Sequence, residues 1–156
     1  MREDNSDLLR KNFQTASILY YAISAAVVFY GGLAYFLIEQ VGMQARITAG
    51  EDVIRGAFIL TALGGLMFTG KLRKLLLPVT HENRPPQEVL TGKLLNADIV
   101  TCAFCELPAL LGFILAVLLA DTGEFYLFGF ISFAGLANNI PRYERWEEYV
   151  RHNYLP

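Results

Sequence analysis

The sequence predicts an all-α, polytopic membrane protein: one domain, residues 1–156, with four transmembrane helices and both termini in the cytoplasm. Of its residues, 54% are hydrophobic and only 18% are charged, an apolar excess that a water-soluble domain of this size would struggle to bury. A helix needs about 17 to 25 mostly apolar residues to cross a bilayer. Four stretches with little or no formal charge approach or meet this length: Asn12 to Ile38, Gly56 to Gly70, Ile99 to Ala120 and Phe125 to Pro141.

The distribution of positive charge predicts the orientation. All 13 basic residues except Arg46 and Arg55 lie before the first apolar stretch, between the second and third, or after the fourth. With four crossings these three segments share one side of the membrane. Because Lys and Arg are enriched in cytoplasmic loops, we expect a multi-pass protein of the inner (cytoplasmic) membrane with both termini inside.

The first two helices are expected at about 15–38 and 52–72. The first contains the small-residue pair Gly31-Gly32, where another helix could approach closely. The second has a short apolar core, so we expect Arg55 and Lys71 to lay their stems along the helix while their charges reach the headgroups.

A cytoplasmic loop is expected at 71–94. Its first part, Lys71 to Leu77, is basic and leucine-rich and is expected to continue the second helix until Pro78 stops it. Pro85 and Pro86 predict an extended turn, after which a helix restarts near Glu88.

The third and fourth helices are expected at about 96–120 and 124–140. Asp121 to Glu124 predicts a tight turn that caps the fourth helix, and Pro141 ends it. The charged cytoplasmic tail, 142–156, contains Trp146, which suits an interfacial helix, as do Tyr149 and Tyr154.

Glu106 lies inside the third apolar stretch, with no basic residue close to it in the sequence. An acidic side chain near the middle of a bilayer costs roughly 2.5 to 3.5 kcal/mol, and such residues mark functional sites by default. We expect Glu106 to be mostly protonated unless a cation or water reaches it. Pro108 frees a backbone carbonyl about one turn before it, a possible local partner for the acid.

Cys102 and Cys105 form a CxxC motif on the same helix. Their depth, about 15 Å along the helix, and the lack of further cysteines favour a structural role over thiol redox chemistry. Small side chains recur at steps of four and three residues, which predicts a seam for close helix packing with Glu106 on its flank. The seam consists of Asp98, Cys102, Cys105, Ala109, Gly112 and Ala116.

Other chemistry finds little support in the sequence. The histidines, His81 and His152, lie in the expected loop and tail, where they suit neither a membrane haem nor a metal site. The chain shows no catalytic triad pattern, phosphate loop or basic stripe for nucleic acid. We expect no cofactor, no metal, no nucleic-acid partner and no intrinsic catalytic activity.

The hairpin of the second and third helices resembles the proteolipid, or c, subunit of rotary ATP synthases. Gly64-Gly65 stands on its first helix, Arg84-Pro85-Pro86-Gln87-Glu88 on its loop, and Glu106-Leu107-Pro108-Ala109 on its second helix. The whole pattern is also similar to small four-helix bacterial membrane proteins described as c-like. This resemblance implies that Glu106 carries a proton or a sodium ion.

Two functions follow as hypotheses. In the first, the chain is a proton- or sodium-handling subunit with Glu106 as its ion-binding residue and Pro108, Cys102, Cys105, Ala109 and Gly112 as packing support. In the second, it is a non-catalytic accessory or scaffold subunit in which Glu106 makes an interhelical hydrogen bond. Reversible disulfide chemistry is a third, weaker alternative. The expected partners are the lipid bilayer and either further copies of the chain or a larger membrane complex.

Overall fold

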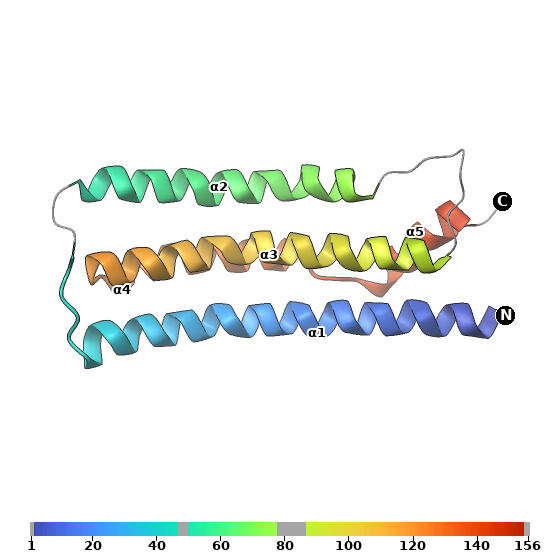
Figure 1. Cartoon of the computed structure of the whole chain (residues 1–156), viewed down its shortest axis with the longest axis horizontal. Helices are drawn as coiled ribbons and strands as arrows, with labels where there is room; N and C mark the ends of the chain where they lie inside the picture. Colours follow the sequence, from blue (N-terminus) through green and yellow to red (C-terminus); the bar gives the residue numbers. More distant parts are fainter. Residues whose placement is uncertain (1, 47–49, 78–86, 155–156) are drawn as a thin grey trace.

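The computed structural model describes residues 2–46, 50–77 and 87–154, and every regular element in these ranges is a helix (Figure 1). The elements in chain order are α1 (Arg2–Tyr35), the π-helix η1 (Phe36–Gln40), α2 (Glu51–Leu76), α3 (Gln87–Leu119), α4 (Thr122–Asn138) and α5 (Tyr143–Tyr154).

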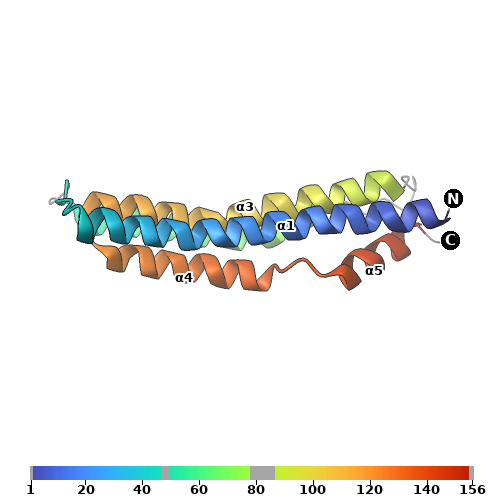
Figure 2. The same cartoon turned by 90° about the horizontal axis from the view of Figure 1, so that it is seen from below.

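The first four α-helices run side by side with alternating direction. In Figure 1, α3 lies between α1 and α2, and α4 lies behind it. Figure 2, turned by 90°, shows α4 as a separate layer beside α1 and α3. The start of α1 and the helix α5 lie at one end of the bundle, while η1 and the turn between α3 and α4 lie at the other (Figure 1).

Three helices, within Ser6–Gln40, Glu51–Leu76 and Gln87–Leu119, are long and apolar enough to cross a membrane. This finding fits the predicted membrane protein. On α2 the large apolar side chains Val53, Leu60, Met67 and Leu75 are each about three-quarters or more exposed. Such a face suits contact with lipid, because a bilayer removes the cost that water would impose on it.

The helices extend further than the apolar stretches. α1 begins at Arg2, well before the expected residue 15, because the leader helps form a core: Leu9 is buried beside Leu94 and Trp146. The expected loop 71–94 is helical at both ends, since α2 continues to Leu76 and α3 starts at Gln87. Residues 78–86, which include Pro78, Pro85 and Pro86, lie outside the described ranges.

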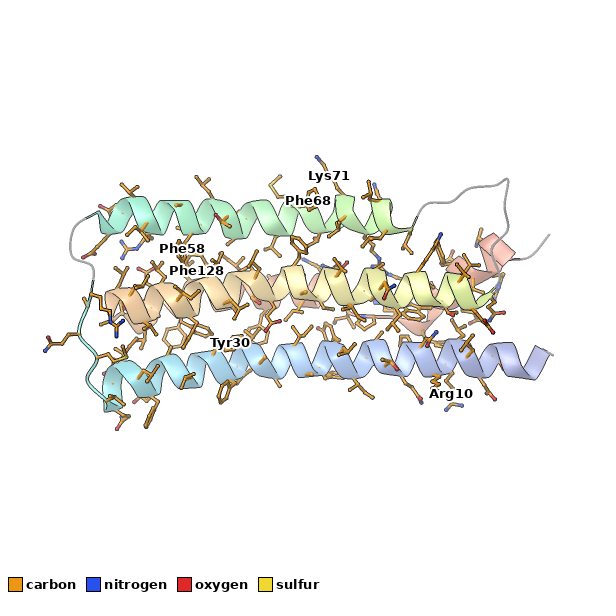
Figure 3. The ribbon with its side chains drawn as sticks, in the orientation of Figure 1. Arg10, Tyr30, Phe58, Phe68, Lys71 and Phe128 are labelled. Carbon is orange, nitrogen blue, oxygen red and sulfur yellow. The ribbon has the colours of Figure 1, made fainter. Side chains whose placement is uncertain are left out.

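Small residues set the distance between helices. A Cβ atom placed on Gly31 would lie 2.6 Å from the ring of Phe125, which brings α1 and α4 together. A Cβ atom on Gly112 would overlap the Cβ of Phe128, so α3 and α4 approach at a point where only glycine fits. Figure 3 shows Phe128 beside Phe58 of α2, and both belong to the core cluster at this end of the bundle.

The turn between α3 and α4 has the predicted cap. Asp121 is the N-cap of α4, and its carboxylate accepts a hydrogen bond of 2.8 Å from the backbone N–H of Gly123. This bond satisfies one of the donors that the first turn of a helix leaves unpaired. Ala120, just before it, adopts a left-handed backbone with φ of 53°, which reverses the chain within a few residues.

The tail helix α5 packs on the bundle. Trp146 is fully buried and contacts Phe13 of α1 edge to face, with ring centroids 5.8 Å apart. The sequence analysis expected the tail to form an interfacial helix; in the structure the Trp146 side chain of this helix faces the bundle core. The reason is that its indole finds both an apolar pocket and a buried hydrogen-bond acceptor inside the protein.

We expect Gly112→Ala to lower the free energy of unfolding by about 1 to 3 kcal/mol, because the added methyl group would force α3 and α4 apart. Gly64→Ala is the matched control, since a Cβ there meets nothing within 4 Å. Denaturant titration in detergent, followed by circular dichroism, measures both. Equal denaturation midpoints for the two variants would contradict the prediction, because they would mean that the close approach of α3 and α4 does not stabilise the bundle.

Candidate functional site

Glu106 lies half-buried on α3 and accepts a hydrogen bond from Tyr30 of α1. The distance from the Tyr30 hydroxyl oxygen to Oε1 of Glu106 is 2.8 Å. In Figure 3 the Tyr30 side chain extends from α1 toward α3, and its ring lies 6.0 Å from that of Phe113. The acid therefore has a neutral donor from another helix.

No ion pair to Glu106 occurs among the residues that the structure describes. An uncompensated carboxylate is strongly disfavoured between apolar helices, whereas a carboxylic acid can remain there if it is hydrogen-bonded. The structure provides this hydrogen bond from Tyr30.

The other residues singled out by the sequence face elsewhere. Cys102, Cys105, Pro108, Ala109 and Gly112 are all buried in α3. Gly112 contacts Phe128, and a Cβ on Gly135 of α4 would lie 3.3 Å from Sγ of Cys105. These contacts place the small-residue seam against α4, while Glu106 on its flank bonds to α1.

Both cysteines are free thiols in the structure. The carbonyl of Cys105 accepts a hydrogen bond of 2.6 Å from Ser132 of α4. The carbonyl that Pro108 leaves without its helical donor is that of Phe104, four residues earlier, so Ser132 binds the next carbonyl along α3. The hydrogen bond that the structure gives for the Glu106 carboxyl group is the one from Tyr30.

A buried charge cluster at the end of the bundle with the termini was not anticipated. Asp98 is 5% exposed; its Oδ1 lies 2.9 Å from a guanidinium nitrogen of Arg73, and its Oδ2 accepts a 2.9 Å hydrogen bond from Trp146. The cluster joins α2, α3 and α5. The sequence analysis used Asp98 only as a small residue in the seam.

A second ion pair, with a buried carboxylate, lies at the opposite end of α2. Arg55 donates to Glu124 of α4 through two nitrogens, at 2.6 and 2.5 Å, and the Glu124 side chain is only 8% exposed. Arg55 was expected to reach the headgroups, but a buried carboxylate offers a closer partner, which corrects that expectation. Lys71 instead points away from α3 in Figure 3.

Metal chemistry receives no support from the described ranges, which contain no group of three or more His, Cys, Asp or Glu side chains that could hold an ion. His152 is exposed and contacts the carbonyl of Glu148 at 3.0 Å, whereas His81 lies outside the described residues.

The chain matches no protein family model, no curated protein and no solved structure. Its functional assignment therefore rests on the geometry of its own residues.

We expect Asp98→Asn to lower the free energy of unfolding by about 1.5 to 3 kcal/mol, because it removes a charged hydrogen bond while Arg73 stays partly buried. Asp52→Asn is the control: Asp52 also pairs with an arginine, but its side chain is 98% exposed, so stability should not change. Denaturant titration of both variants makes the comparison. An unchanged midpoint for Asp98→Asn would mean that the buried pair does not stabilise the fold.

Proposed function

We propose that this chain is a small proton-handling subunit of the cytoplasmic membrane, in which Glu106 binds and releases the proton. The observation that carries the proposal is the half-buried Glu106 carboxyl group, hydrogen-bonded to the neutral Tyr30 hydroxyl and not to a cation. A basic partner would hold the acid permanently ionised, whereas a phenol donor leaves it able to take up a proton.

The proposal favours a proton over sodium. A sodium ion bound without its hydration shell needs several oxygen ligands, and the phenol oxygen of Tyr30 is the partner that the structure gives for Glu106. Thr101, the nearest side-chain hydroxyl candidate on α3, donates instead to the carbonyl of Ala97 at 2.7 Å.

The proposed topology has four crossings with both termini in the cytoplasm. α4 has 17 residues, which at 1.5 Å per residue is about 25 Å, close to the roughly 30 Å apolar thickness of a bilayer. The alternating directions of α1 to α4 bring the start of α1, the end of α2 and the tail helix α5 to one end of the bundle (Figure 1). Lysine and arginine residues lie in all three segments: Arg10 and Lys11, Arg73 and Lys74, and Arg145 and Arg151. The positive-inside rule then supports a cytoplasmic position for that end.

A second candidate function is a non-catalytic scaffold subunit of a larger membrane complex. The specific observation in its favour is that the same Tyr30–Glu106 bond joins α1 to α3, which is the contact expected of a purely structural interhelical acid. The resemblance of the α2–α3 hairpin to proteolipid subunits of rotary ATP synthases supports the proton-handling proposal over this one.

We expect dicyclohexylcarbodiimide to label Glu106 in native membranes, with labelling that falls as the pH rises, because the reagent reacts with protonated acids in apolar surroundings. Glu124 provides an internal control, since its carboxyl group is occupied by Arg55 and should remain unlabelled. Peptide mass spectrometry measures both sites. If Glu106 stays unlabelled at every pH, the proton-handling proposal is wrong.

We expect Glu106→Gln to retain folding and assembly but to abolish proton flux into proteoliposomes, measured with a pH-sensitive dye. The amide can still accept the bond from Tyr30, but it cannot release a proton. Retention of both assembly and flux would favour the scaffold function.

The companion variant Tyr30→Phe tests the scaffold function directly. It keeps the ring beside Phe113 and removes the hydroxyl that joins the two helices. A scaffold should lose about 0.5 to 1.5 kcal/mol of stability and release its partner complex more readily. A proton-handling subunit should remain labelled by the carbodiimide.

A further inference from the structure

A cleft of about 380 Å³ opens between α1 and the start of α5. It is lined by Arg10, Phe13 and Gln14 of α1 and by Tyr143 of α5. The three α1 residues are spaced i, i+3 and i+4, so they share one face of the helix. The volume lies within the range of about 300 to 1,000 Å³ that is typical of small-molecule sites.

The aromatic wall of the cleft, formed by Phe13 and Tyr143, is positioned by contacts with neighbouring side chains. The ring of Phe13 packs edge-on against Tyr143, with centroids 5.3 Å apart, and against Trp146. Trp146 is itself positioned by the hydrogen bond that it donates to Asp98, and Asp98 forms an ion pair with Arg73. The wall is therefore formed before any ligand arrives, and binding does not have to order it.

The polar groups of the cleft match an anion. Arg10 offers a guanidinium fork, Gln14 an amide donor and Tyr143 a hydroxyl, and no carboxylate is among the described lining residues. Arg10 is exposed and extends to the side of α1 away from α3 in Figure 3. The guanidinium can form two parallel hydrogen bonds with the oxygens of a phosphate group, as it can with a carboxylate.

The position of the cleft favours a lipid as the source of that phosphate. Arg10 lies immediately before the apolar stretch that starts at Asn12, so it stands where α1 passes from charged to apolar residues. In a membrane this is the level of the headgroups, where basic pockets bind anionic lipids. Phe13, one turn further along α1, offers an apolar surface to the start of an acyl chain.

We propose that this cleft binds one anionic phospholipid, with Arg10 pairing with the phosphodiester, Gln14 and Tyr143 donating to its oxygens, and Phe13 contacting the acyl chain. This site is separate from Glu106, and it does not depend on proton handling.

The test is native mass spectrometry of the full chain in detergent, with phosphatidylglycerol, phosphatidylcholine or inorganic phosphate added. We expect one phosphatidylglycerol molecule to bind in preference to phosphatidylcholine. Arg10→Gln should weaken its binding by about tenfold or more, as expected for the loss of a charged hydrogen bond. Tyr143→Phe, which keeps the ring, should weaken it by about threefold.

Lys11→Gln is the matched control, because it removes the same charge from the next residue, which does not line the cleft. It should leave binding unchanged. The proposal is overturned if Lys11→Gln weakens binding as much as Arg10→Gln, or if both lipids bind equally. It is also overturned if inorganic phosphate displaces phosphatidylglycerol at equal concentration, since the ligand would then be free phosphate.

Discussion

Polar side chains between these helices need partners within the protein, because neither hydrocarbon nor a packed core supplies hydrogen bonds. Within the described residues no buried side-chain nitrogen or oxygen lacks a partner. The partners of three acids lie on other helices. Asp98 binds Arg73 of α2 and Trp146 of α5, Glu124 binds Arg55 of α2, and Glu106 binds Tyr30 of α1. The arrangement of the bundle therefore follows from where its acids can be satisfied.

The three acids are satisfied in different ways, and this difference separates their roles. Asp98 and Glu124 each pair with an arginine of α2, so each of these ion pairs joins two helices. Within the described residues, Glu106 instead accepts a hydrogen bond from a phenol and pairs with no cation. That contrast is the reason why the proton-handling proposal rests on Glu106 and not on the other two acids.

The sequence was sufficient for features that depend on local pattern. The apolar stretches located the helices, the spacing of Cys102, Cys105, Ala109 and Gly112 located a buried seam, and Asp121 marked a helix cap. It did not reveal the partners of Asp98, Glu124 or Glu106, because these come from distant parts of the chain. One signal was present: Arg73 and Asp98 stand twelve residues on either side of Pro85-Pro86. In an antiparallel hairpin such positions lie at the same level.

The two arginines of α2 have a consequence for how that helix can move. Arg73 bonds to α3 near one end, and Arg55 bonds to α4 near the other. Sliding α2 by one turn, about 5.4 Å along its axis, would pull both guanidinium groups away from their carboxylates at once. α2 is thereby held at two points, and only one alignment with its neighbours keeps both ion pairs intact.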